Sequence, residues 1–239
     1  MQEPKIIYED DLIYVLEKPS GWITNDADTT TNQPVIQKWV RENFNYPLKG
    51  NREARDGIVH RLDKETSGIL LVAKTKEAFE ELQGQFKSRI VSKSYTALVH
   101  GDVVLKTGQI KAEVGRLPWR RDRFGVLPGG RESETNYQTV GNYESQTTKE
   151  KLTLLELVPK TGRTHQIRIH LKHIGHPIIA DEFYAGRKTA RNDRQWCPRL
   201  FLHAGKITFK HPKTQEKIKF ESVLPQDLRE TLAKLTKLA

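Results

Sequence analysis

The segment HRLDKETSGILLVAK, residues 60–74, joins a polar half to a compact apolar half. Residues 69–73 have the length and composition of a buried strand. The Thr-Ser-Gly triplet at 66–68 predicts a tight bend before that strand, because hydroxyls bond the local backbone and glycine tolerates close approach. We therefore expect Asp63 to lie in a turn at the mouth of a buried strand. Arg61 stands two residues before it, and a nearby cation favours an ionised carboxylate.

Outward from this segment, the chain shows more strand patterns than helix patterns. Strand-like alternation or short apolar runs occur at residues 5–8, 13–16, 92–101, 108–116, 134–143, 152–158, 200–204, 206–209 and 217–220. Apolar residues at helical spacing occur at residues 34–44, 76–89, 164–174 and 225–238. Strands joined by short turns favour antiparallel pairing. The sequence therefore predicts an α+β fold, and we expect a single domain over residues 1–239.

Three polar stretches interrupt this pattern. Residues 49–56 predict a mobile loop that leads into the segment of Asp63. Residues 117–133, LPWRRDRFGVLPGGRES, predict a loop whose arginines and aromatics suit phosphate contacts and base stacking, although a solvated hairpin loop would share this composition. A second basic loop is expected at residues 187–199. The candidate RNA contacts of the two basic loops are Trp119, Arg120, Arg121, Arg123, Arg187, Lys188 and Arg191.

The composition favours a polyanionic partner and a reducing compartment. The chain has 40 Lys and Arg against 30 Asp and Glu, a formal charge of +10, which suits RNA but also an anionic membrane surface or a generally basic exterior. A single cysteine, Cys197, excludes an internal disulfide. The longest apolar run, residues 69–73, is far shorter than the roughly 20 residues of a membrane span. The N-terminus is too polar for a signal peptide, so we expect a cytoplasmic protein. A monomer without an obligate protein partner is the default expectation.

Two other classes of site are disfavoured by spacing. The strand, glycine loop and helix around residues 152–174 suggest a phosphate loop, but TGRT lacks the G-x-x-x-x-G-K-[ST] pattern of nucleotide hydrolases. Four histidines, His165, His170, His173 and His176, follow no common zinc spacing and have no accompanying cysteine cluster. We therefore expect no metal, and no redox or electron-sink cofactor.

Four segments resemble, in the same order, the motifs of the RluA-type pseudouridine synthases. KPSG at 18–21 is similar to the first shared motif, and HRLDKETSGILLVAKT at 60–75 is similar to the central catalytic motif. KSYTALVHG at 93–101 and TGRTHQIRIHL at 161–171 resemble the second and third motifs. The resemblance runs from about residue 6 to 225 and fits the short members, which lack an S4-type RNA-binding domain.

This resemblance implies a mixed, largely antiparallel sheet flanked by helices, with a central active-site cleft. It implies that the protein isomerises uridine to pseudouridine in ribosomal or transfer RNA, acting on a flipped-out base. The catalytic residue would be Asp63, with Tyr95 packed on the target base and Arg168 paired with the Asp63 carboxylate. Further substrate-binding candidates are His60, Arg61, Thr66, Arg163, His165, Gln166 and Leu202.

Several alternatives remain open at this point. The carboxylate of Asp63 could act as a nucleophile or as a general base. A basic RNA-binding module would need no such set of Asp63, Tyr95 and Arg168. A hydrolase of glycosidic bonds would usually need a second carboxylate as acid, for which Glu65 is the only near candidate.

Overall fold

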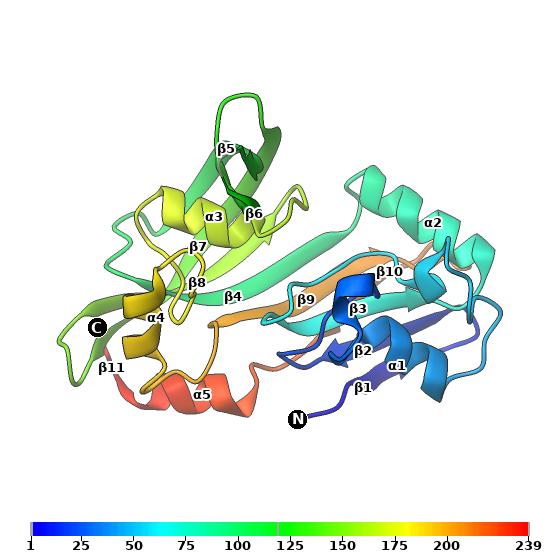
Figure 1. Cartoon of the computed structure of the whole chain (residues 1–239), viewed down its shortest axis with the longest axis horizontal. Coiled ribbons are helices and arrows are strands. Elements are labelled where there is room, and N and C mark those ends of the chain that lie inside the picture. The colour runs from blue at the N-terminus through cyan, green and yellow to red at the C-terminus, as the bar shows by residue number, and fades with distance from the viewer. Residues whose placement is uncertain (1, 119, 239) are drawn as a thin grey trace. The chain divides into compact units, whose positions relative to one another are not determined.

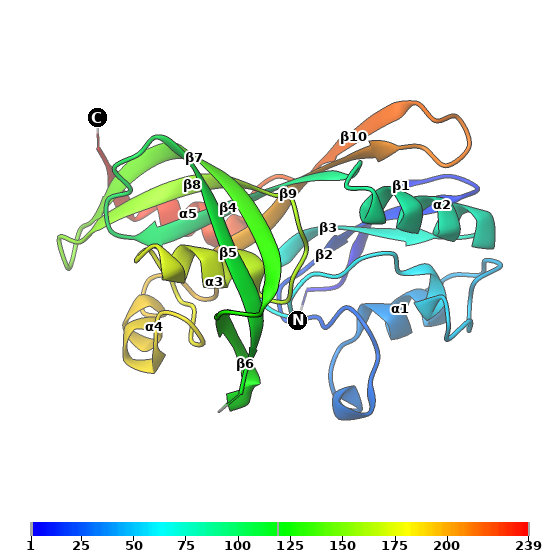
Figure 2. The ribbon, with the colours of Figure 1, turned by 90° about the horizontal axis from the view of Figure 1, so that it is seen from above.

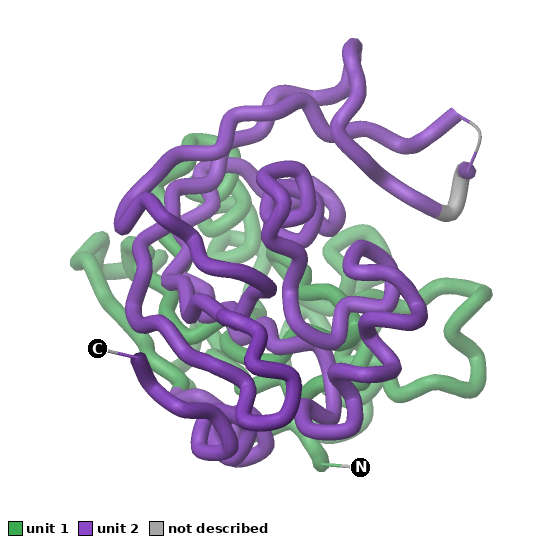
Figure 3. The backbone as a smooth tube through the Cα atoms, turned by 90° about the vertical axis from the view of Figure 1, so that its left-hand side faces the viewer, with its two compact units in different colours: residues 1–93, 204–222 green, residues 94–203, 223–239 purple. Residues whose placement is uncertain are grey.

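The chain forms two compact units. A computed structural model describes residues 2–118 and 120–238. Unit 1 consists of residues 1–93 and 204–222, and unit 2 of residues 94–203 and 223–239 (Figure 3). The expectation of one domain over residues 1–239 stays a prediction.

Unit 1 is built on a mostly antiparallel set of strands (Figure 1), of which β3 (Ser67–Ala73) is fully buried. Its strands are β1 (Lys5–Glu9), β2 (Ile13–Lys18), β3, β9 (Leu202–Lys210, in this unit from residue 204) and β10 (Lys217–Glu221). They pair in the order β1-β2-β3-β9-β10. All seven residues of β3 are buried, which confirms the predicted strand after the Thr-Ser-Gly bend.

The two α-helices of unit 1 are shorter than predicted. Helix α1 (Ile36–Asn43) begins only after Val35, whose extended backbone keeps Pro34 outside the helix. Helix α2 (Lys76–Lys87) is capped by Thr75, whose hydroxyl accepts the backbone N–H of Ala78 at 3.2 Å. Short 3-10 turns lie at Asp28–Thr30 and Arg55–Gly57.

Residues 49–56 are not the loosely held polar loop that we expected. The side chain of Asp56 is fully buried and accepts hydrogen bonds from Gln37 at 2.8 Å, Arg41 at 2.7 Å and the Gly50 N–H at 2.6 Å. Burial alone would raise the pKa of Asp56, but these donors outweigh it and the pKa is lowered. The segment is therefore fixed from within by one ionised carboxylate.

The strands of unit 2 pair antiparallel and are strongly twisted (Figure 2). Its strands are β4 (Ser92–His100, in this unit from residue 94), β5 (Thr107–Leu117), β6 (Arg120–Val126), β7 (Arg131–Ser145), β8 (Lys151–Pro159) and β11 (Leu235–Lys237). The order is β4-β8-β7-β5-β6, and β11 pairs with β7.

The predicted loop at residues 117–133 is wrong, because this stretch contains strand β6 and the first residues of β7. Strand β5 runs to Leu117, and β6 pairs back onto it with Arg116 opposite Phe124. The described side chains of β6 are half-buried or exposed, so they give no apolar alternation for sequence analysis to detect.

Three helices complete unit 2: α3 (Gln166–His173), α4 (Arg187–Asp193) and α5 (Gln226–Ala233). The second basic loop is thus partly a helix, α4. The predicted helix over 225–238 is too long, because Leu235–Lys237 leaves the helix to pair with β7. These elements confirm an α+β fold with largely antiparallel strands. None of the helices in the described part of the chain is long and apolar enough to cross a membrane.

Candidate active site

The turn that carries Asp63 in unit 1 is held through its backbone. The Thr66 N–H donates to the carbonyl of Asp63 at 3.1 Å and closes the turn. On the other side, the Thr24 hydroxyl donates to the Leu62 carbonyl at 2.8 Å and accepts the Leu62 N–H at 3.1 Å. The Asp63 side chain is half-buried at the surface of this fixed turn.

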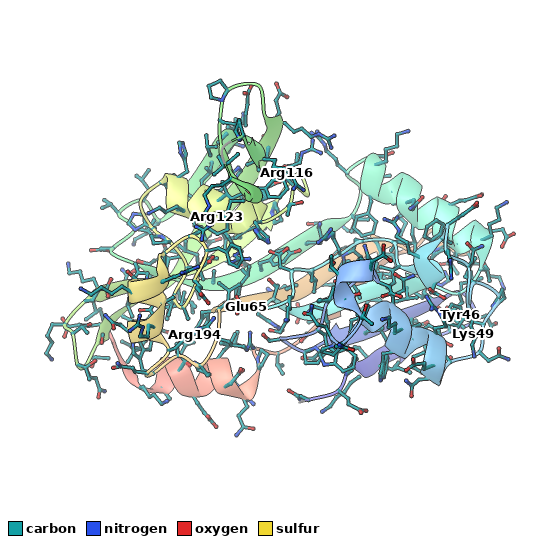
Figure 4. All side chains as sticks on the ribbon, in the orientation of Figure 1. Tyr46, Lys49, Glu65, Arg116, Arg123 and Arg194 are labelled. Carbon is teal, nitrogen blue, oxygen red and sulfur yellow. The ribbon has the colours of Figure 1, made fainter. Side chains whose placement is uncertain are left out.

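The KPSG segment, residues 18–21, holds the same turn by hydrogen bonds to its backbone. Lys18 is completely buried, and its ammonium donates to the carbonyls of Pro19 at 2.9 Å, Trp22 at 2.8 Å and Lys64 at 3.2 Å. The Ser20 hydroxyl donates to the carbonyl of Glu65 at 2.8 Å. The first motif therefore fixes the two residues that follow Asp63, and Glu65 belongs to the braced turn (Figure 4).

Gly68 allows the strand after the turn to approach its neighbour. Its φ is +123°, and a Cβ built there would lie 2.2 Å from the carbonyl oxygen of Ala204 on β9. Just before it, Thr66 is 2% exposed, and its hydroxyl has no hydrogen-bond partner among the described residues. The bend thus combines a backbone that only glycine fits with one buried hydroxyl left without a partner.

His60 and Arg61 differ in their surroundings. Arg61 is exposed. The Nε2 atom of His60 accepts the N–H of Leu71 at 3.0 Å, and the ring stacks on Phe86 with centroids 4.9 Å apart. Burial, and next the charge of Lys93, lower the pKa of His60 to about 3, so the ring is neutral. Since Nε2 accepts, the ring proton lies on Nδ1.

Arg168, in unit 2, is fixed by a partner that we did not predict. Its Nε and Nη2 atoms each donate to Asp181 at 2.7 Å, and both side chains are buried. The guanidinium also lies over the rings of Phe183 at 5.4 Å and Tyr184 at 5.1 Å. Asp181 Oδ1 accepts the N–H groups of both aromatic residues, at 3.0 and 3.1 Å. The pairing of Arg168 with Asp63 stays a prediction.

Gln166 is bound on all sides within unit 2. Its Oε1 atom accepts from the Thr161 hydroxyl at 2.7 Å and the Arg163 N–H at 3.0 Å. Its Nε2 atom donates to the Glu134 carbonyl and the Thr135 hydroxyl, both at 3.0 Å. An amide group has two donors and one acceptor oxygen, so this pattern favours support of the TGRT loop over the predicted substrate contact.

His165 begins helix α3 within an aromatic cluster. Its φ is +55°, and its Nδ1 atom lies 2.9 Å from the hydroxyl of Tyr184. The ring also meets Phe124 of β6 at 6.3 Å and Phe183 at 5.9 Å, edge to face. This contact connects the hairpin of β5 and β6 to the segment that holds Arg168.

The other predicted site residues of unit 2 fall into three groups. Tyr95 on β4 and Leu202 at the start of β9 are buried. Arg163 is half-buried, and its Nη2 atom donates to the carbonyl of Glu132 at 3.4 Å. Its Nε atom is buried and has no hydrogen-bond partner among the described residues. The basic side chains Arg120, Arg187, Lys188 and Arg191 are exposed. Trp119 and the side chain of Arg121 lie outside the described part of the structure.

Two arginines of the β5–β6 hairpin are engaged with aromatic rings (Figure 4). Arg123 donates to the Phe183 carbonyl at 2.9 Å and its guanidinium lies 5.4 Å from that ring. Arg116 lies 5.0 Å from the ring of Phe124. Arg123 is therefore partly used in holding the hairpin, which its predicted role as an RNA contact did not anticipate.

No group of three or more His, Cys, Asp or Glu side chains within residues 2–118 and 120–238 is arranged to hold a metal ion. His170 is instead a fully buried group bonded to the hydroxyls of Ser133 and Thr135, both at 2.9 Å. Burial lowers its pKa to about 4, so it is neutral. His170 therefore links helix α3 to strand β7.

Comparison with known proteins identifies the family. Residues 12–173 match the family model described as RNA pseudouridylate synthase. An uncharacterized RNA pseudouridine synthase of Bacillus subtilis is 37% identical over 233 residues, which cover 97% of this chain and 73% of the relative. The ribosomal large subunit pseudouridine synthase D of Pseudomonas aeruginosa is 36% identical over 234 residues, which cover 94% of this chain and 69% of the relative.

A solved human structure, RNA pseudouridylate synthase domain containing 1, aligns with a TM-score of 0.76 at 25% identity, covering 99% of this chain and 89% of its own. The braced Asp63 turn and the Arg168 cluster thus occur in a chain whose relatives are named as pseudouridine synthases. The chain belongs to the RNA pseudouridylate synthase family and is an RNA pseudouridine synthase.

Proposed function

We propose that the protein isomerises uridine to pseudouridine in ribosomal RNA and that Asp63 is its catalytic carboxylate. The observation that carries this proposal is the bracing of the Asp63 turn. Side chains of Lys18, Ser20 and Thr24 bind the backbone of residues 62–65 and use none of the carboxylate oxygens for this purpose. Catalysis needs a group whose position is fixed before the substrate arrives.

The reaction exchanges one bond for another without a redox change. The bond between uracil N1 and the sugar C1′ breaks, the base turns, and its C5 atom joins C1′. C5 then loses its proton and N1 gains one, so atoms and electrons balance. A carboxylate can add to an electron-poor sugar carbon as a nucleophile or take a proton from the sugar as a base. In either role Asp63 must be ionised.

Two groups of unit 2 are proposed to complete the site. Arg168 would favour the ionised form of Asp63, since a guanidinium stabilises a nearby carboxylate. The pair with Asp181 supports this role, because it fixes the Nε and Nη2 edge and sets the direction of the remaining Nη1 edge. Tyr95 would pack against the target uracil after the uridine leaves its stack.

Ribosomal RNA is the proposed substrate because relatives at 34–36% identity are named ribosomal large subunit pseudouridine synthase D. Transfer RNA is the alternative. The basic composition, 40 Lys and Arg against 30 acidic residues, suits either polyanion. We also propose that the protein works as a monomer in the cytoplasm.

The test incubates the purified protein with unmodified transcripts of large-subunit ribosomal RNA and of transfer RNAs, and maps pseudouridine at nucleotide level. We expect pseudouridine in the ribosomal transcript with wild-type protein and none with Asp63→Asn. Release of free uracil would indicate a hydrolase instead. Binding without pseudouridine in any transcript would indicate a non-catalytic RNA-binding module.

A further inference from the structure

Lys93, at the start of β4 in unit 1, is a half-buried cation without a counter-charge. Its ammonium lies over the ring of Phe86, 5.6 Å from the centroid. Among the residues that the structure describes, no carboxylate pairs with it. Burial alone lowers the pKa of Lys93 to about 8, so the ammonium remains largely charged at neutral pH.

A second polar group without a partner lies against the same aromatic ring. His60 stacks on Phe86, and its Nε2 atom is used by the Leu71 N–H. Its Nδ1 atom therefore carries the proton and is buried without a hydrogen-bond acceptor among the described residues. Lys93 is near enough for its charge to lower the pKa of His60. Phe86 thus holds one cation and one neutral N–H donor, and neither has an anionic or acceptor partner among residues 2–118 and 120–238.

Such an arrangement costs stability unless a ligand completes it. A charge removed from water without a partner is destabilising, and so is a buried donor without an acceptor. Replacing the cation by an apolar side chain would relieve this cost, so its presence indicates a role outside folding. An anion with acceptor oxygens would satisfy both groups.

We propose that Lys93 and the Nδ1–H of His60 bind a phosphate group of the RNA backbone beside Phe86. The proposal rests on the proposed function, since it takes RNA as the ligand. A compact ammonium is suited to phosphate as a point charge, and a neutral N–H adds one directed hydrogen bond. His60 precedes Asp63 by three residues, so one of the two phosphate-binding residues would be close in sequence to the catalytic residue.

The surface beside Phe86 is accessible to a ligand. An open hollow of about 490 Å³ lies at the end of α2, lined by Val59, Gly84, Phe86 and Lys87 among others. One carboxylate, Glu80, also lines it, but its charge is offset by Lys76 at 3.9 Å. The hollow therefore makes Phe86, the ring that both groups contact, accessible from solvent, although Lys93 and His60 do not line the hollow themselves.

The experiment compares Lys93→Met, Lys93→Arg and a matched control, Lys49→Met. Methionine keeps an unbranched stem over Phe86 and removes the charge, whereas arginine keeps the charge. Lys49 is an exposed lysine of the same unit and has the same loss of charge (Figure 4). Affinity for the ribosomal RNA transcript is measured at several salt concentrations, together with the melting temperature of each free variant.

We expect Lys93→Met to weaken RNA binding roughly tenfold at low salt and to reduce the slope of log affinity against log salt by roughly 0.7–0.9. Its melting temperature should be equal to or above that of the wild type, because an unpaired half-buried charge is gone. Lys93→Arg should retain most of the slope, and Lys49→Met should change neither property.

Two results would overturn the site. One is a Lys93→Met variant with the affinity and slope of Lys49→Met. The other is a melting temperature lowered in Lys93→Met with unchanged RNA binding, which would make Lys93 a structural residue. A wild type that binds RNA but forms no pseudouridine would contradict the proposed function alone, because the slope comparison still decides the role of Lys93.

Discussion

The Asp63 turn of unit 1 and the Arg168 cluster of unit 2 are fixed by different kinds of interaction. Asp63 is positioned by bonds to its backbone neighbours, from Thr24 and Lys18 among others. Arg168 is positioned through its own side chain, by a buried ion pair with Asp181 and by two rings. A group held by its backbone can change its side chain without moving the chain. A group held by its side chain cannot.

The largest expected effect is on turnover in Asp63→Asn. The amide cannot act as a nucleophile or as a base, so pseudouridine formation should fall by at least about a thousandfold, within the range of acid–base and covalent catalysis. Because the turn is held through its backbone, the melting temperature and RNA affinity should stay close to wild type. Product is measured by mapping pseudouridine in the transcript.

A matched control for this variant is Asp56→Asn. Asp56 is the fully buried carboxylate that Arg41 and Gln37 bind in the same unit. Its replacement should lower stability, because Arg41 loses its charged partner, and leave turnover per folded molecule near wild type. Residual activity of Asp63→Asn within tenfold of wild type would remove Asp63 from the reaction.

The second-largest expected effect is a loss of stability when the Arg168 cluster, which is held by side chains, is changed. Arg168→Ala should lower the free energy of unfolding by about 3–5 kcal/mol, because it strands the buried carboxylate of Asp181. Arg168→Lys should recover only part of this loss, since an ammonium cannot form the two parallel bonds that the guanidinium makes. Chemical denaturation measures both variants. A Lys variant with wild-type stability would mean that the forked geometry contributes nothing.

The third effect tests the close approach behind the turn. Gly68→Ala should lower the free energy of unfolding by about 3 kcal/mol, since the new Cβ meets the Ala204 carbonyl at a φ that disfavours alanine. Gly84 provides the control, because it lies in α2 with no atom within 4 Å of a new Cβ. Gly84→Ala should raise the free energy of unfolding by roughly 0.5–1 kcal/mol. Equal effects of both changes would contradict the close approach.

The parts of the site that sequence analysis predicted are continuous in the chain. The bend at 66–68 and the buried strand β3 depend on neighbours a few residues away. The strand-and-turn pattern also gave the antiparallel α+β class, because strand alternation and turn residues are local signals.

The parts that were missed depend on distant partners or on exposed surfaces. Asp56 is bound by Gln37 and Arg41, and Asp181 is bound by Arg168, all more than ten residues away in sequence. Nothing in the spacing marks these acids as buried. Strand β6 was taken for part of a loop because its Arg-rich sequence shows no apolar alternation. Each of these features follows from tertiary contacts, which override local propensity.

The smallest effect extends the comparison to pH and involves His100 in unit 2. Its two ring nitrogens lie 2.8 Å from Glu150 and 3.1 Å from Asp193, the last residue of α4. Burial alone would lower the pKa of His100, but the hydrogen bonds to Asp193 and Glu150 outweigh it and raise the pKa to about 9. The imidazolium therefore joins α4 to β4 and to the turn before β8 at neutral pH.

The direction in which stability changes with pH follows from the linkage between proton binding at His100 and folding. The pKa of His100 in the folded protein, about 9, lies above the ordinary value of 6.5, so the stabilisation is complete below about pH 6.5 and disappears as pH rises through 9. Wild-type stability should fall by no more than about 2 kcal/mol from pH 7 to 9 relative to His100→Gln, whose side chain does not titrate. The measurement is denaturant unfolding of both proteins at several pH values. Parallel pH profiles for wild type and His100→Gln would show that the imidazolium does not hold α4.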